Sequence, residues 1–129
     1  MIEITTALND ARLQAVVDFL AQGTTNATIT LYSGDRPAIG ATPSGTALVA
    51  IPLVEPAGTV SGGVLTLTSP PEEMVTTSGV ATWARVANGN GVVAFDCDVS
   101  DETGSGEITM QTTTLYAGGF ARIVAGVLG

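Results

Sequence analysis

Short runs of β-forming residues dominate the chain after Gly23. Thr, Val and Gly are frequent in this part, and turn residues separate one run from the next, which is typical of strands. We expect strands at residues 27–32, 47–53, 64–68, 80–86, 92–97, 107–111 and 122–128. About seven such strands predict a mainly β fold, an antiparallel β-sandwich or a barrel-like domain.

The sequence Asn88-Gly89-Asn90-Gly91 holds two Asn-Gly pairs between two of the expected strands. Tight hairpin turns require positive φ angles, which Asn and Gly adopt most easily, so this segment predicts a hairpin. Residues 33–46 and 70–79 contain Pro and Gly and predict long loops. No change of composition marks a boundary, and we expect a single domain over residues 1–129, with the β domain at 27–128.

One segment before the strands has helical periodicity. Its apolar residues recur at the spacing of one helix face: Leu13, Val16, Val17 and Leu20. Asn9 suits the N-cap position, Leu8 can pack over the first turn, and Gly23 suits the position after the last turn. These signals predict a helix at residues 10–22, which is too short to be stable alone and has to cover one face or open end of the sheet.

The charged residues exclude several kinds of function. The chain has twelve acidic residues, four Arg, no Lys and no His, for a net charge of −8. Nucleic-acid binding needs clustered cations, and a chain without His has neither a Ser-His-Asp set nor an imidazole metal ligand. No apolar run approaches the ~20 residues of a membrane span, and the start lacks the pattern of a secretory signal. We expect no enzymatic activity, no cofactor, no metal and no membrane or nucleic-acid partner.

The acidic stretch Asp96–Glu102 is the densest charge cluster in the chain. Its oxygens are ligands that Ca²⁺ prefers, but the EF-hand spacing is missing, and we interpret it as a strand end leading into a solvated turn. Cys97 lies between two Asp, which raise a thiol pKa, so we expect a buried or inert thiol. Glu72 and Glu73 are adjacent and point to opposite sides, which argues against an acid/base pair.

Four residues are candidate partner contacts. Trp83 and Arg85 lie two apart in one expected strand and share a face, so the guanidinium can stack on the indole. Trp83 is equally compatible with the core and with a partner-facing position. Asp35 and Arg36 precede Pro37 in the 33–46 loop, where they either contact a partner or stabilise the turn. Trp and Arg are the residue types enriched at interface hot spots.

Several stretches together resemble a known family. They are ITLYSGDRPA at 29–38, GTALVAIPL at 45–53, TSGVATWARV at 77–86 and GVVAFD at 91–96. Their order resembles a family of small virion structural proteins of tailed bacteriophages and related prophages, over nearly the whole chain. The resemblance carries no catalytic residues and implies assembly of a particle.

The resemblance implies a minor capsid or decoration (cement) protein on the phage head, located in the virion and assembled in the bacterial host cytoplasm. A neck or tail component is the alternative, and a ligand- or Ca²⁺-binding β module is a third. Only 12% of residues are charged and Lys is absent, so apolar surface and strand edges need to be covered. We expect a homo-oligomer, a dimer or a trimer, that also binds other virion proteins such as the major capsid protein.

Overall fold

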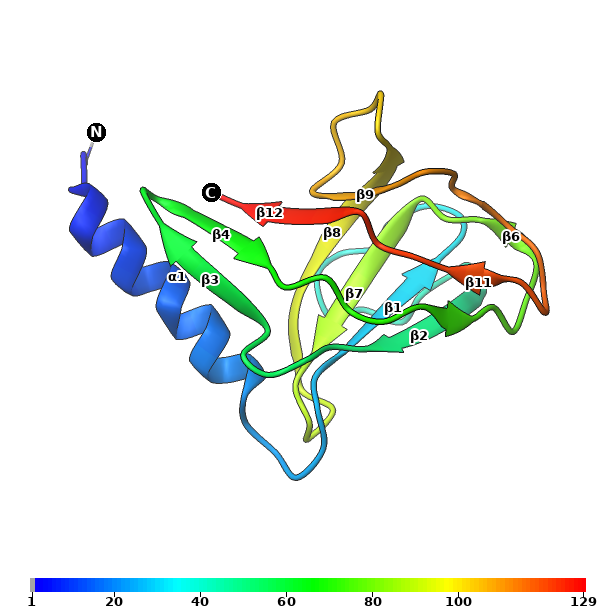
Figure 1. Cartoon of the computed structure of the whole chain (residues 1–129), viewed down its shortest axis with the longest axis horizontal. Helices are drawn as coiled ribbons and strands as arrows, with labels where there is room; N and C mark the ends of the chain where they lie inside the picture. Colours follow the sequence, from blue (N-terminus) through cyan, green and yellow to red (C-terminus); the bar gives the residue numbers. More distant parts are fainter. Residues whose placement is uncertain (1) are drawn as a thin grey trace.

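A computed structural model describes residues 2–129 and shows a mainly β chain with one N-terminal helix (Figure 1). The helix α1 spans Thr6–Leu20. Twelve strands follow: β1 (Thr28–Tyr32), β2 (Ala47–Pro52), β3 (Gly58–Ser61), β4 (Val64–Leu67), β5 (Glu73–Met74), β6 (Gly79–Val80), β7 (Trp83–Ala87), β8 (Val93–Asp101), β9 (Ile108–Met110), β10 (Thr114–Leu115), β11 (Phe120–Ala121) and β12 (Ala125–Leu128).

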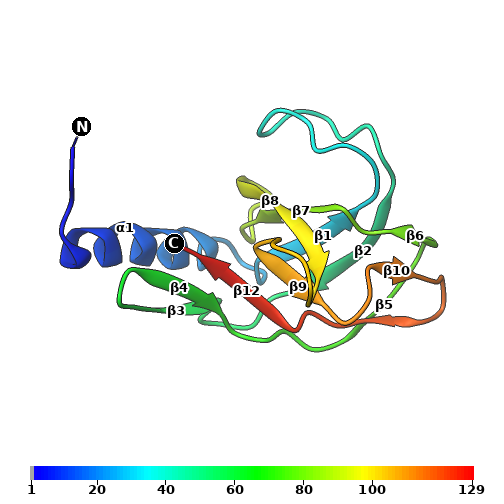
Figure 2. The ribbon, with the colours of Figure 1, turned by 90° about the horizontal axis from the view of Figure 1, so that it is seen from above.

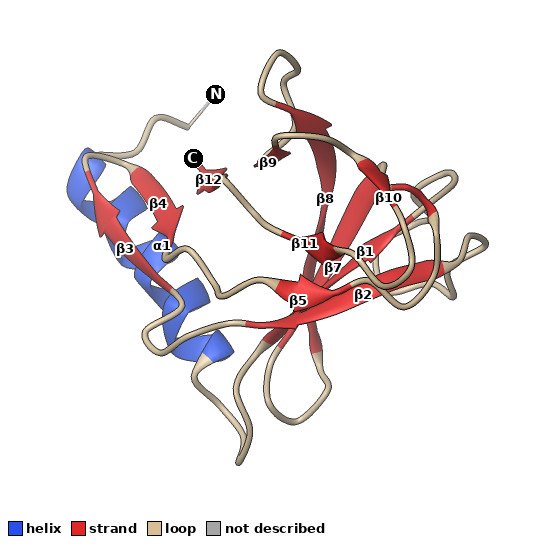
Figure 3. Ribbon diagram, turned by 45° about the vertical axis from the view of Figure 1, so that its right-hand side comes forward, coloured by secondary structure: helices blue, strands red, loops and turns tan. Residues whose placement is uncertain are grey.

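Eight strands form one curled sheet in the order β2-β1-β7-β8-β9-β12-β4-β3, which makes a half-barrel (Figure 3). The barrel-like fold class is therefore confirmed. Two short ladders, β6 with β10 and β5 with β11, extend one end of the molecule. Both strands at the ends of the large sheet, β2 and β3, have a single strand neighbour.

The expectation of a purely antiparallel sheet is wrong at one pair, because β8 and β9 run parallel. The chain doubles back between them in a tight loop at residues 102–107. Gly106 N donates to the Ser100 hydroxyl, and Asp98 N donates to a carboxylate oxygen of Glu107. A Cβ at Gly106 would lie 2.8 Å from Ser100 N, so only glycine fits this return.

One of the expected strands is divided in two, and another is shortened. The segment 80–86 forms β6 and β7, because Ala81 N bonds to Thr113 O and Thr82 N bonds to Tyr32 O. In the segment 122–128, only residues 125–128 form a strand, β12. Strands β3, β5, β10 and β11 were not expected at all, and β5 lies inside the segment 70–79 that the sequence predicts to be a loop. The other long loop, 33–46, is confirmed as free of strands.

The predicted hairpin at 88–91 is confirmed, because it joins the antiparallel strands β7 and β8. The Asn88 side-chain oxygen accepts from Asn90 N and Val92 N, both at 3.0 Å, and Gly91 has a φ of 78°. The turn also packs against the segment after the helix. Gly89 N donates to Gln22 O, and a Cβ at Gly89 would lie 2.0 Å from Thr25 O.

The helix exists as predicted but begins four residues earlier and ends at Leu20 rather than at residue 22. Thr5 is the N-cap, and its hydroxyl accepts from Leu8 N at 3.1 Å. Asn9 does not cap the helix. Its amide donates to Gly63 O at 3.2 Å, and the Asp10 carboxylate accepts from Gly63 N at 2.6 Å. The polar residues near the expected start therefore bind the β3–β4 turn instead.

The helix packs beside the β3–β4 hairpin, along one side of the half-barrel (Figure 2). Its predicted apolar stripe is buried at Leu13, Val17 and Leu20. Leu13 and Val17 pack with Leu65 in a small core under the helix, while Leu20 belongs to the main core inside the curled sheet. Within the described chain, α1 is neither long nor apolar enough to cross a membrane.

Candidate functional site

Trp83 and Arg85 lie on the face of β7 that points away from the main core. Side chains alternate along a strand, and the neighbouring residues Ala84 and Val86 point into the main core. Tyr32 of β1 is the register partner of Trp83, and the two rings stack with centroids 4.4 Å apart and planes 12° apart. The Arg85 guanidinium carbon lies 5.3 Å from the indole centroid. The predicted cation–π contact is therefore confirmed.

Arg85 also forms a bidentate ion pair with Asp96, its register partner on β8. Arg85 Nε donates to Asp96 Oδ1 at 2.8 Å, and Nη2 donates to Oδ2 at 3.0 Å. The side chain of Arg85 is 12% exposed and that of Asp96 is 3% exposed. The hydrogen bond from Asp96 raises the pKa of Arg85 above its ordinary value, although burial opposes this shift.

The 33–46 loop covers this outer face of the sheet (Figure 2). Arg85 Nη2 donates to Ala41 O at 2.8 Å, which ties the middle of the loop to the cluster. The base of the loop is closed where Ser33 N donates to Thr46 O and Thr46 N donates to the Ser33 hydroxyl. A Cβ at Gly45 would lie 1.8 Å from Ser33 O, so this closure requires glycine. We call Tyr32, Trp83, Arg85 and Asp96 the covered cluster.

The structure decides between the alternatives for two of the four candidate residues. Trp83 is 1% exposed, which places it in the interior under the loop, and its ring offers no surface to a partner. Arg85 is held under the same loop by its hydrogen bonds to Asp96 and to Ala41 O. Arg36 pairs with Asp98 of β8 at 3.2 Å, while both side chains stay largely exposed, and Asp35 is exposed beside it. A partner role for Asp35 and Arg36 stays a prediction.

The acidic stretch is mostly strand, because β8 continues to Asp101. Asp96 and Asp98 are two residues apart in β8 and share one face of the sheet. On this face Asp96 pairs with Arg85 of β7, and Asp98 pairs with Arg36 of the 33–46 loop. Asp101 accepts from the amide and the hydroxyl of Thr103 at 3.0 and 2.6 Å, and these hydrogen bonds lower the pKa of Asp101. Within residues 2–129, no three His, Cys, Asp or Glu side chains come together in a group that could hold a metal ion.

Cys97 is buried, as expected. Burial raises the pKa of its thiol to about 12, and the nearby Glu107 and Asp98 add to the shift. The thiol therefore remains protonated and unreactive at neutral pH.

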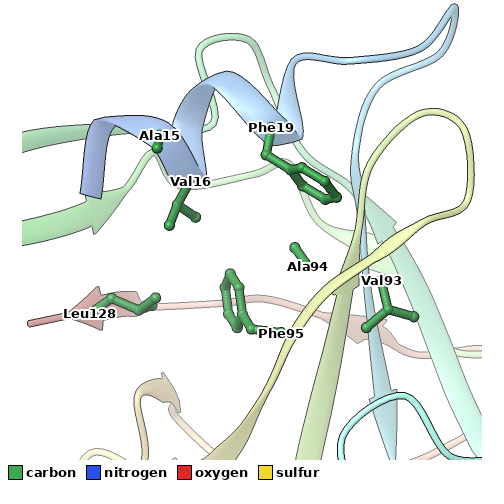
Figure 4. A pocket seen from close by; sticks show the side chains of 7 residues that line it. All are labelled: Ala15, Val16, Phe19, Val93, Ala94, Phe95 and Leu128. Carbon is green, nitrogen blue, oxygen red and sulfur yellow. The ribbon is translucent and has the colours of Figure 1, made fainter. Parts of the chain in front are cut away.

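A second feature, an apolar groove between α1 and β8, has no counterpart among the sequence predictions (Figure 4). Its volume is about 400 Å³, and the side chains that line it are all apolar: Ala15, Val16, Phe19, Val93, Ala94, Phe95 and Leu128. Phe19 projects from the helix and Phe95 from β8, while Leu128 of β12 lies at the other end. The groove joins segments more than 70 residues apart. Only the apolar residues on one flank of the helix, the exposed Leu8 and Ala15 and the partly buried Phe19, could have indicated it.

Seven of the eleven large exposed apolar side chains in residues 2–129 lie at the two ends of the molecule. At the helix end they include Ile2 (90% exposed), Ile4 and Leu8. At the opposite end, where the two short ladders lie, they are Met74, Val80, Tyr116 and Phe120, which we call the end patch. Tyr116 is 70% exposed and Phe120 is 62% exposed.

Comparisons with protein-family models, with curated proteins and with solved structures gave no match for this chain.

Proposed function

We propose that this protein is a structural subunit of a bacteriophage particle, a minor capsid or decoration protein that binds the head surface as a homo-oligomer. The observation that carries the assembly role is the pair of exposed apolar groups at opposite ends of one small domain. The phage particle itself comes from the sequence resemblance. A subunit that contacts two neighbours needs two such surfaces, one at each end.

The low charge of the surface supports this proposal. Monomeric proteins rarely expose large contiguous apolar patches, and such patches mark interaction sites. The sheet is also open, since β2 and β3 each lack a second strand neighbour. Open edges pair with other chains unless they are protected, and this chain has no Lys for that purpose.

The polar side chains support a scaffold more than a reaction. Arg36 and Arg85 are both engaged in ion pairs with Asp of β8. The one cysteine is buried with a pKa of about 12. The most elaborate polar arrangement, the covered cluster, fastens a loop and is closed to substrates, because Trp83 and Asp96 are almost completely buried.

The direct test is incorporation into particles. We expect electron micrographs of particles assembled with the protein to show density on the head that is missing from particles assembled without it. Quantification of copies per particle separates decoration of the head, which needs many copies, from a neck or tail position, which needs few. Particles with no copies of the protein would refute the proposal.

A variant pair tests the end patch. Phe120→Asp places a charge in the patch, and we expect incorporation to fall at least tenfold while the fold is retained. Thr24→Asp adds the same charge in an exposed loop outside the patch and should leave incorporation unchanged. Equal incorporation of both variants would exclude the end patch as a contact.

A further inference from the structure

Residues 2–4, which we call the arm, are extended and exposed ahead of α1 (Figure 2). In an extended segment Ile2 and Ile4 point to one side and Glu3 points to the other. Two neighbouring Ile without cover, followed by the exposed Leu8, form an apolar edge with a single negative charge.

The apolar groove offers a matching surface. Leu8, Arg12, Ala15 and Phe19 follow each other at spacings of four, three and four, so they share one flank of α1. Ala15 and Phe19 line the groove. Arg12 lies about one turn before Ala15 on the same flank of the helix. Arg12 is exposed and forms no ion pair with any of residues 2–129. An apolar floor beside a free cation complements an apolar segment that carries one carboxylate.

The arm cannot enter the groove of its own chain. From Thr5 the helix rises about 15 Å to Ala15 and about 21 Å to Phe19, at 1.5 Å per residue. Ile2 lies three residues before Thr5 and reaches about 10 Å when fully extended. The occupant therefore has to come from another molecule.

We propose that the groove between α1 and β8 binds the arm of a second copy of this chain, in a two-fold dimer with antiparallel α1 helices. This proposal deepens the proposed self-association and rests on it. In this arrangement each arm, which precedes the N-terminus of its own helix, lies along the C-terminal half of the partner's helix. Ile4 and Ile2 cover the groove, and Glu3 lies near Arg12 of the partner subunit. The interface uses the same patch on both copies, as two-fold symmetry requires.

Sedimentation equilibrium of matched variants tests the contact. Ala15→Glu puts a charge on the groove wall at an exposed helix position, and we expect the dimer dissociation constant to rise at least tenfold. Gln14→Glu adds the same charge on a different flank of the same helix and should change the constant less than twofold. Ile4→Asp lies outside the helix and the sheet, so it cannot unfold them, and it should weaken the dimer as Ala15→Glu does.

A mixing experiment shows whether the contact joins two molecules. Glu3→Arg and Arg12→Glu should each weaken their own homodimer, because like charges then face each other. An equimolar mixture should form a heterodimer of near wild-type affinity, because both ion pairs are restored, one of them with reversed sign. A mixture as weak as the separate variants overturns the proposal, and so does a wild-type protein that remains monomeric at 100 µM, about a hundred times the dissociation constant of an ordinary micromolar contact.

The outcomes also separate this inference from the proposed function. Particle incorporation together with a dimer that Ala15→Glu does not weaken would refute the groove contact alone. A dimer that responds as expected, in a protein that never enters particles, would refute the virion role alone.

Discussion

Replacing Asp96 with Asn should destabilise the protein by about 3 kcal/mol. The substitution removes the negative charge but keeps the shape, and it leaves the guanidinium of Arg85 under the 33–46 loop with no counter-ion. Breaking a buried ion pair by removing one partner costs about 3–5 kcal/mol. We expect the lower end of this range, because Arg85 keeps its hydrogen bond to Ala41 O and its contact with the Trp83 ring.

The chain carries its own probe for this measurement, because its single Trp belongs to the covered cluster. Urea unfolding followed by Trp83 emission should show the midpoint falling by about 1.5 M for Asp96→Asn, at a slope of about 2 kcal/mol per M. Thermal unfolding should show a fall of about 10 °C. Far-UV circular dichroism at the same urea concentrations reports whether the sheet unfolds together with the cluster.

Asp98→Asn is the matched control for this prediction. It is the same substitution on the same face of the same strand, but it breaks the exposed pair with Arg36, where the side chains are 43% and 59% exposed. Exposed pairs contribute about 0–1 kcal/mol, so its midpoint should shift by no more than about 0.5 M. If Asp96→Asn cost no more than Asp98→Asn, the burial argument for the covered cluster would be refuted.

Three further predictions concern single side chains. Thr5→Ala should cost about 0.5–2 kcal/mol by removing the N-cap, measured by thermal unfolding; a Thr5→Ala variant as stable as the unmodified protein would contradict this cap. Cys97 should react with a thiol reagent only as the protein unfolds, because its side chain is buried. Its pKa in the folded protein, about 12, lies above the ordinary value of 9.0, so the free energy of unfolding should fall as the pH rises from 9.0 to about 12. Thr103→Ala should raise the pKa of Asp101 in an NMR titration, because the hydroxyl of Thr103 donates one of the hydrogen bonds that lower it. The lowered pKa stabilises the fold above pH 3.8, and this contribution is lost as the pH falls further. An unchanged titration of Asp101 would exclude the Thr103 hydroxyl as a cause of the lowered pKa.

Local signals in the sequence predicted much of the fold. The helical stripe predicted the buried side of α1, and the Asn-Gly turn predicted the β7–β8 hairpin. Strand alternation placed Trp83 and Arg85 on one face, where the structure stacks them. Each of these features depends on residues close together in the chain, so periodicity and turn chemistry suffice to predict them.

The sequence could not predict features that depend on distant partners. Asn9 and Asp10 look like helix-start residues, but the nearby Gly63 turn binds their side chains and Thr5 caps instead. The short strands β5 and β10 form only because a segment 34 or more residues away supplies their hydrogen bonds. Propensity alone is too weak to define strands of two residues.

The candidate sites show the same difference between features that depend on neighbouring residues and features that depend on distant ones. The sequence by itself determined a low-charge β domain with one amphipathic helix and an inert cysteine. It also placed Arg36 in a loop and Arg85 in a strand. Only the tertiary structure decided that Trp83 is covered by the 33–46 loop, that Asp96 is the partner of Arg85, and that α1 and β8 enclose an apolar groove. The reason is that burial and ion pairing join residues across the folded chain, where sequence spacing carries no information about distance.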